Sequence, residues 1–124
     1  MKIGIVGLGS MGKPIALQLL QAGHQVIAWN RSMAPVDELV RRGAKGARTV
    51  SETLQGDLVL SILFDDDAIR KTLLGSEGCT IGKPDCIHVC TSTVSLVFAK
   101  ELQEFHDVHG LSYVGAPMLG RPAI

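Results

Sequence analysis

Short apolar runs alternate along the chain with stretches in which apolar residues recur every three or four positions. The short runs are typical of buried strands in a parallel sheet, and the longer stretches are typical of helices that pack one face against it. Because the connections suit crossovers and not hairpins, the pattern predicts an α/β fold with a doubly wound parallel sheet. Six strands are expected, at Lys2–Val6, Gln25–Trp29, Lys45–Ala47, Asp57–Leu63, Cys86–Cys90 and from Leu111 to Val114.

Helices are expected between these strands, with a long loop at Gly75–Asp85. In the second helix Val36, Leu39 and Val40 should face inward, and in the last helix Val94, Val97, Phe98, Leu102 and Phe105 mark one face. Thr49 and Glu52 have the spacing of a capping box at the start of a brief helix. One helix is predicted to follow Gly12 as far as Ala22–Gly23, and two others cover Pro35–Arg42 and Thr49–Gln55. A fourth begins at Asp65, and the last one ends near His109–Gly110.

Length and charge narrow the class of protein. A chain of 124 residues fits one domain, and its 12 basic residues are balanced by 12 acidic ones. Proteins that bind nucleic acids or membrane surfaces usually carry excess positive charge, and this chain has none, so neither partner is expected. No apolar run approaches the ~20 residues that span a bilayer, and no charged leader precedes the first strand, so we expect a cytoplasmic protein.

Cysteines, histidines and a carboxylate cluster offer little chemistry of their own. Cys79, Cys86 and Cys90 are odd in number and lack C-x-x-C spacing, which predicts reduced, buried or half-buried thiols. Carboxylates at Asp65–Asp67 could bind a hard metal, but helix capping is the favoured explanation. No metal-ligand spacing joins the histidines, and none is expected to be catalytic; His88 lies in a strand, and His106 and His109 end a helix, where positive charge is favourable.

The strongest motif is Gly7-Leu8-Gly9-Ser10-Met11-Gly12, between the first strand and the first helix. This G-x-G-x-x-G pattern, inside a β-α-β unit, is typical of dinucleotide-binding domains. The first glycine permits a tight turn, the second lets the pyrophosphate approach the backbone, and the third lets helix and strand pack closely. The alternative is the same turn without a ligand.

The end of the second strand distinguishes the two nicotinamide cofactors. An Asp or Glu roughly 20 residues after the glycines binds the ribose 2′-OH of NAD. This chain has Asn30-Arg31-Ser32 there, which offers a guanidinium and neutral donors to a 2′-phosphate. NADP is therefore favoured over NAD, and an exposed loop arginine without a ligand is the alternative.

Several spaced motifs together resemble the β-hydroxyacid dehydrogenase superfamily, which includes 3-hydroxyisobutyrate dehydrogenases, glyoxylate reductases and 6-phosphogluconate dehydrogenase, with imine reductases as relatives. The resemblance covers essentially the whole chain. It implies a Rossmann domain followed by an all-helical domain that forms a homodimer and completes the active site. The motifs are G-L-G-S-M-G-K-P-I-A, A-G-H-Q-V, W-N-R-S, T-S-T-V-S and Y-V-G-A-P-M.

The resemblance also implies roles for residues of this chain. Leu63 and Phe64 match positions whose backbone passes beside the cofactor. Thr93 matches a threonine near the nicotinamide, and Ser92 and Thr93 are candidates on the substrate side; capping of the next helix is their alternative role. Residues matching the pyrophosphate loop and the 2′-phosphate site are Gly7, Gly9, Gly12, Asn30, Arg31 and Ser32.

Two departures from the family pattern concern catalysis. Many members read A-P-V-S-G-G where this chain has Leu119 and Arg121 in A-P-M-L-G-R, and leucine cannot donate a hydrogen bond to a substrate carboxylate. The chain also ends at Ile124, before the family's catalytic lysine and asparagine. We therefore expect a cofactor-binding domain whose intact protein transfers hydride between NADP(H) and a small hydroxy acid, carbonyl or imine. A free-standing NADP(H)-binding regulatory module is the alternative.

Overall fold

The sheet is formed by six parallel strands in the order β3-β2-β1-β4-β5-β6. This computed structural model describes residues 1–9, 11–63, 66–73, 85–91 and 96–115. The order reverses between β1 and β4, as in doubly wound dinucleotide-binding folds, which confirms the predicted fold class. The strands are β1 (Lys2–Val6), β2 (Gln25–Trp29), β3 (Lys45–Gly46), β4 (Leu58–Ser61), β5 (Ile87–Cys90) and β6 (Tyr113–Gly115).

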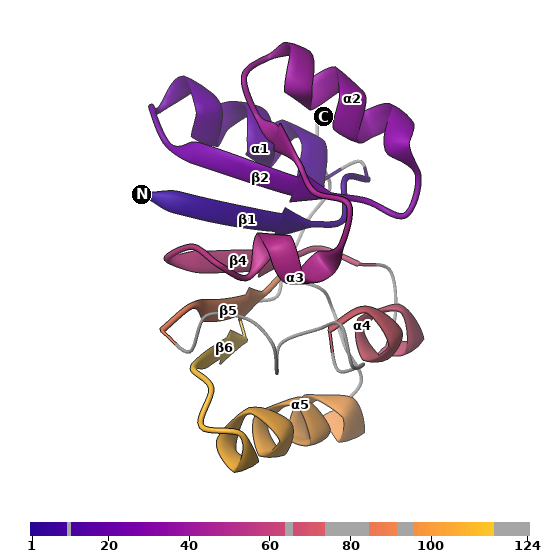
Figure 1. Cartoon of the computed structure of the whole chain (residues 1–124). Coiled ribbons are helices and arrows are strands. Elements are labelled where there is room, and N and C mark those ends of the chain that lie inside the picture. Colours follow the sequence, from indigo (N-terminus) through magenta and orange to yellow (C-terminus); the bar gives the residue numbers. More distant parts are fainter. Residues whose placement is uncertain (10, 64–65, 74–84, 92–95, 116–124) are drawn as a thin grey trace.

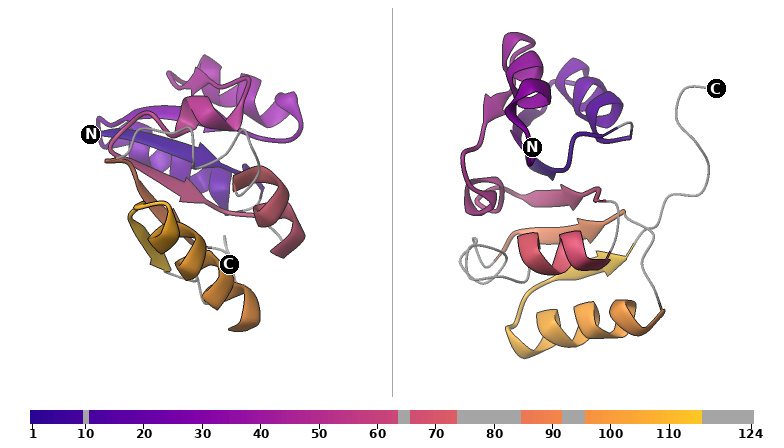
Figure 2. Two further views of the ribbon diagram at one scale, coloured as in Figure 1. Left: turned by 60° about the horizontal axis from the view of Figure 1, so that its bottom comes forward. Right: turned by 90° about the vertical axis from the view of Figure 1, so that its right-hand side faces the viewer.

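Helices cover the two faces of the sheet in separate groups. Figure 1 shows α1 and α2 gathered beside β1 and β2, with α4 and α5 at the other half of the molecule. The other views in Figure 2 show the same grouping, and α3 contributes Val50 to the core on the side of α4 and α5. The helices are α1 (Gly12–Gln21), α2 (Met33–Arg41), α3 (Val50–Thr53), α4 (Asp66–Leu73) and α5 (Leu96–Val108).

Each face of the sheet has its own hydrophobic core, because successive strand residues point to opposite faces. Ile3 and Ile5 of β1 pack with Val36 and Leu39 of α2 on one side. The other core gathers apolar residues from β4, β5 and the helices α3, α4 and α5. Its buried members are Val6, Val50, Leu54, Val59, Ile69, Leu73, Cys86, Cys90, Phe98 and Leu102.

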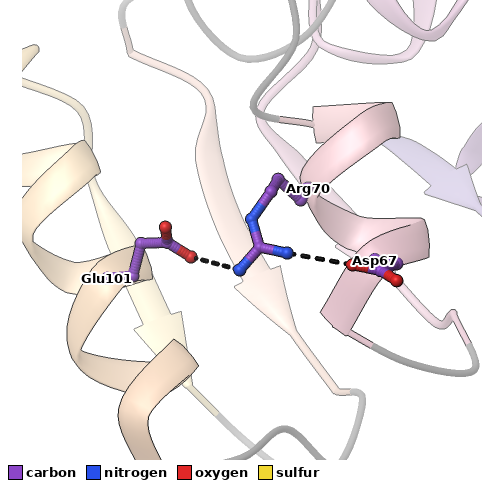
Figure 3. A network of polar contacts seen from close by, with 3 residues as sticks. All are labelled: Asp67, Arg70 and Glu101. Carbon is purple, nitrogen blue, oxygen red and sulfur yellow. Dashed lines mark hydrogen bonds and ion pairs between the residues drawn. The ribbon is translucent and has the colours of Figure 1, made fainter.

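An ion-pair network joins the two helices that cover the second core. Arg70 of α4 donates one hydrogen bond of 3.0 Å to Asp67 and another of 2.9 Å to Glu101 of α5 (Figure 3). The same guanidinium lies 4.8 Å from the centre of the Phe98 ring. Asp67 therefore has a structural partner, and among the described residues no cluster of His, Cys, Asp and Glu could hold a metal.

Three sequence predictions about individual side chains are wrong. Val40 is 46% exposed and Val97 is 81% exposed, because the buried stripes of their helices are narrower than the apolar periodicity indicated. The capping box is absent, since the Glu52 carboxylate accepts a 3.0 Å hydrogen bond from the Arg48 N–H, one residue before the expected partner. The Thr49 hydroxyl pairs instead with the Ser51 hydroxyl at 2.9 Å.

One other prediction is confirmed within the described part of the chain. Cys86 and Cys90 are free, buried thiols. None of the helices described is long and apolar enough to cross a membrane. Cys79 and residues 75–84 of the loop expected at Gly75–Asp85 lie outside the described residues.

Candidate dinucleotide site

The glycine-rich loop lies where the strand order of the sheet reverses, between the carboxyl ends of β1 and β4. Doubly wound sheets bind their ligands in the crevice at this point. The Ile62 N–H donates a 2.8 Å hydrogen bond to the Val6 carbonyl, so the two strand ends stay together up to the loop. A Cβ atom on Gly7 would lie 2.1 Å from the Ile62 carbonyl oxygen. The first glycine is thus required by the packing of the two strand ends.

The three glycines of the motif have different surroundings. Gly7 has a φ angle of +102°, which side chains rarely adopt, and Gly12 is packed so closely that a Cβ atom would lie 2.0 Å from the Gly7 carbonyl oxygen. Gly7 and Gly12 are buried, whereas Gly9 is exposed. Internal packing therefore accounts for the first and third glycines, and the second lies at the surface, where a ligand can approach its backbone.

The N-terminus of α1 opens directly from this loop. Met11 is the N-cap and makes no side-chain capping bond, and the first turn contains no acidic residue. Unpaired N–H groups and the helix dipole favour an anion at such a terminus. The Lys13 side chain forms an ion pair with Glu38 of α2, which ties the start of α1 to the neighbouring helix.

Asn30 links the loop to the end of β2. Its side-chain oxygen accepts a 2.9 Å hydrogen bond from the Leu8 N–H. Its side-chain nitrogen donates to the Ser32 carbonyl oxygen at 3.1 Å and to the Ser32 hydroxyl oxygen at 3.2 Å. The amide that sequence analysis assigned to the 2′-phosphate site thus has contacts within the protein at both ends.

Arg31 lies between these two bonded residues and is exposed. Among the described residues, its guanidinium has no hydrogen bond or ion pair. A free cation at the end of β2, with no carboxylate in the Asn30-Arg31-Ser32 segment, is suited to an anionic ligand.

The fold brings most of the predicted site residues to one edge of the sheet. Leu63 follows β4 and packs against the core that includes α4 and α5. Those at the carboxyl ends of β1, β2 and β4 are Gly7, Leu8, Gly9, Met11, Gly12, Asn30, Arg31, Ser32 and Leu63. The predicted positions Ser10, Phe64, Ser92 and Thr93, like Leu119 and Arg121, lie outside the described residues.

A buried chain of polar side chains was missed by sequence analysis. The Ser61 hydroxyl lies 2.7 Å from His88 Nε2, His88 Nδ1 lies 2.9 Å from His106 Nε2, and His106 Nδ1 lies 2.7 Å from the Leu102 carbonyl oxygen. His106 is fully buried, so the expectation that it carries a favourable positive charge at the helix end is wrong. A signal existed in the sequence, since His88 alternates with Cys86 and Cys90 on the core side of its strand.

Burial determines the protonation state of these polar side chains. Desolvation, together with the neighbouring His106, lowers the pKa of the His88 imidazole to about 3. Burial also lowers the pKa of His106, and it raises that of Tyr113, which packs against both imidazole rings, to about 12. All three groups are therefore uncharged at neutral pH.

The same polar chain reaches the edge of the sheet where the loop lies. Ser61 ends β4, and its carbonyl oxygen accepts hydrogen bonds of 3.0 Å from both the N–H and the hydroxyl of Thr91. These bonds fix the carboxyl ends of β4 and β5 against each other. The segment after Thr91 carries the predicted nicotinamide contacts and lies outside the described residues.

The order of the strands, together with the glycine-rich loop at the point where that order reverses, defines a dinucleotide-binding Rossmann domain. Comparison with known families gives the particular group. The model for the NAD binding domain of 6-phosphogluconate dehydrogenase matches residues 2–123, and the chain belongs to this family.

The proteins that this chain is similar to include the kinds of oxidoreductase that its sequence motifs resemble. The uncharacterized oxidoreductase YfjR of Bacillus subtilis (strain 168) is 38% identical over 124 residues, which are 98% of this chain and 43% of YfjR. An imine reductase from Pseudomonas sp. is 30% identical with a TM-score of 0.88, over 98% of this chain and 42% of that chain. The 3-hydroxyisobutyrate dehydrogenase of Mycobacterium tuberculosis is 25% identical with a TM-score of 0.89, over 97% of this chain and 41% of that chain. The chain thus spans less than half the length of these relatives.

Proposed function

We propose that this chain is the cofactor-binding part of an oxidoreductase and that its cofactor is NADP(H) in preference to NAD(H). The observation that carries the preference is the exposed Arg31 without a described partner, beside the Ser32 hydroxyl and with Asn30 where NAD-binding domains have an acid. A guanidinium offers a 2′-phosphate charge and two parallel donors. A carboxylate at this position would repel the same phosphate.

The described residues fit the remainder of a dinucleotide. Its pyrophosphate would lie at the exposed Gly9 and the uncapped N-terminus of α1, where backbone N–H groups face an anion. Its adenosine end would lie toward Arg31, and its nicotinamide end toward the carboxyl ends of β4 and β5. We assign the contacts there to Leu63 and, outside the described residues, to Phe64 and Thr93.

In the intact protein, we propose that the bound cofactor exchanges hydride with a small hydroxy acid, carbonyl or imine. The cofactor supplies the hydride chemistry, and the residues of this chain bind and orient it. The proton-transfer group and most of the substrate contacts are assigned to a helical domain beyond these 124 residues, which also forms a homodimer. This assignment agrees with the share of the relatives that the chain covers, 41 to 43% of their length.

Titration with the two reduced cofactors tests the preference. Trp29 is the only tryptophan and lies next to Asn30, so energy transfer from its indole to the dihydronicotinamide reports binding. NADPH should bind more tightly than NADH, and Arg31→Asp should weaken NADPH by about tenfold to a hundredfold, the equivalent of about 1.5–3 kcal/mol for a charged hydrogen bond. Arg42→Asp is the matched control, because it makes the same change of charge after the last turn of α2, away from the loop. Equal selectivity in the wild type and in Arg31→Asp would contradict the proposal.

A further inference from the structure

We propose that Asn30 is a positioning residue for the dinucleotide, which holds the glycine-rich loop with its side-chain oxygen and orients the Ser32 hydroxyl with its side-chain nitrogen. Direct contacts with the 2′-phosphate then belong to Arg31 and Ser32. This inference rests on the proposed function, because it assigns roles within the same site. It changes the role of Asn30 from a phosphate ligand to the residue that makes the other contacts possible.

The side-chain oxygen of Asn30 extends the pairing of β1 with β2 beyond the end of the two strands. The register ends with Val6 opposite Trp29, and the Gly7 N–H still reaches the Trp29 carbonyl at 2.9 Å. At the next residue the Leu8 N–H is met by the Asn30 side chain, also at 2.9 Å. Leu8 is only 4% exposed, so water is a poor substitute for this acceptor. The loop conformation that presents Gly9 thus depends on the Asn30 oxygen.

The side-chain nitrogen of Asn30 acts on Ser32. Ser32 is the N-cap of α2, yet its hydroxyl makes no capping bond to the helix. Its oxygen instead accepts a hydrogen bond of 3.2 Å from Asn30, and its carbonyl accepts another of 3.1 Å. Because the hydroxyl oxygen is held as an acceptor, its own hydrogen remains to be donated to a phosphate oxygen. The Asn30 nitrogen has two hydrogens, and when each binds one of these two acceptors a direct bond from the nitrogen to the phosphate would have to replace one of them.

Two substitutions separate the two ends of the amide. Asn30→Ala removes both, whereas Asn30→Asp keeps an acceptor for the Leu8 N–H but cannot donate to Ser32. The aspartate also places a negative charge beside Arg31, where the 2′-phosphate is proposed to bind. Since only NADPH has that phosphate, the loop contact should affect both cofactors and the Ser32 contact should affect NADPH alone.

Dissociation constants for NADPH and NADH in the 124-residue chain test this division. Asn30→Ala should weaken both cofactors by about tenfold, the loss expected for one buried hydrogen bond that holds the loop. Asn30→Asp should bind NADH within about threefold of the wild type or more tightly, because an acid here can also accept a hydrogen bond from the ribose 2′-OH, and it should leave NADPH at least tenfold weaker. The control Ser32→Ala should weaken NADPH and leave NADH unchanged. If Asn30→Ala weakens only NADPH, Asn30 is a direct phosphate ligand and the positioning role is wrong.

A second measurement does not depend on cofactor binding. Without cofactor, hydrogen exchange at the Leu8 amide should be faster in Asn30→Ala than in the wild type and should slow again in Asn30→Asp, while exchange in β4 stays unchanged. Unchanged Leu8 exchange in a folded Asn30→Ala variant would overturn the inference. Failure of the wild type to bind either cofactor would instead overturn the proposed function, so the two failures are distinguishable.

Discussion

The Nδ1 atom of His88 lies 2.9 Å from the Nε2 atom of His106, inside the core that packs against α5. Only one arrangement of protons satisfies this contact and its neighbours. The Leu102 carbonyl can only accept, so His106 Nδ1 donates to it, and His106 Nε2 must accept from His88 Nδ1. His88 Nε2 then accepts from the Ser61 hydroxyl. A proton added to His106 Nε2 would leave two donors facing each other, and a proton added to His88 Nε2 would place a buried charge on the ring and force the Ser61 hydroxyl to turn and accept.

This arrangement predicts that acid destabilises the domain as pH falls below about 6.5. In the unfolded chain a histidine binds a proton as pH falls through about 6.5, whereas burial keeps the pKa of folded His88 at about 3. Stability from the neutral ring is thus complete above about pH 6.5 and is lost between pH 6.5 and 3. At pH 5.5 the loss from His88 should be about 1.4 kcal/mol in the free energy of unfolding, and the lowered pKa of His106 acts in the same direction.

Urea unfolding at pH 7.5, 6.5 and 5.5 measures this loss. The range avoids the Glu38 carboxylate, whose pKa lies below 4.5 because of its pairing with Lys13. The double variant His88→Leu/His106→Leu should lose most of the dependence on pH over this interval. Replacement of the less buried pair, His24→Gln/His109→Gln, is the control and should retain it. A pH dependence that is the same in both double variants would contradict the assignment of neutral imidazoles.

The second glycine of the loop should be needed for binding and not for folding. Gly9→Val places a branched side chain on an exposed backbone position where the pyrophosphate is proposed to approach, so cofactor binding should be abolished while the melting temperature changes little. Gly12→Ala is the contrasting variant, because its Cβ atom would lie 2.0 Å from the Gly7 carbonyl oxygen and should destabilise the fold itself. A folded Gly9→Val variant with wild-type affinity would place the cofactor elsewhere.

The 124-residue chain should bind cofactor without enzymatic turnover. General acid–base catalysis contributes about 100- to 10,000-fold, and positioning of the substrate contributes as much or more. Both are assigned to the part of the relatives that this chain does not span. NADPH oxidation across a panel of small carbonyls and imines checks the prediction, with Thr93→Ala as control. Turnover near one per second that falls in the variant would show a complete active site in this chain.

One face of β5 and β6 should drive self-association. Ile87 is 39% exposed and Val114 is 49% exposed, on the side of the two strands opposite α5, and none of the described helices covers them. Ile87→Thr/Val114→Thr should lower the apparent mass in sedimentation at high protein concentration. Val97→Thr/Val108→Thr is the control, because these exposed residues lie about three turns apart on α5 and form no continuous patch. Equal association in both double variants would contradict the role of this sheet face.

The fold was predictable because its signals are local. The alternation of strands and helices, the glycine turn after β1 and the glycine stop at Gly23 can each be recognised in a few consecutive residues. The ends of elements were less predictable, since Ile62 and Leu63 are as apolar as the strand before them although β4 ends at Ser61. Hydrophobicity does not distinguish a strand from the half-buried loop that continues it.

The candidate site was predictable in composition and not in its internal contacts. Nothing in the local sequence indicates that the Asn30 amide reaches Leu8, 22 residues earlier in the chain. The pairing of His88 with His106 likewise depends on α5 packing across β5. Such contacts follow from tertiary structure, which brings together residues whose individual propensities are unremarkable.

Mapping amide chemical shifts during a titration with NADPH and then with NADH tests whether NADP(H) binds at the carboxyl ends of β1 and β2. Large shifts are expected at Gly7, Leu8, Gly9 and Gly12 with both cofactors. Shifts at Arg31 and Ser32 should be large with NADPH and small with NADH. Equal shifts at Arg31 with both cofactors would contradict its contact with the 2′-phosphate, and perturbations centred on α5 and β6 would contradict the proposed binding site.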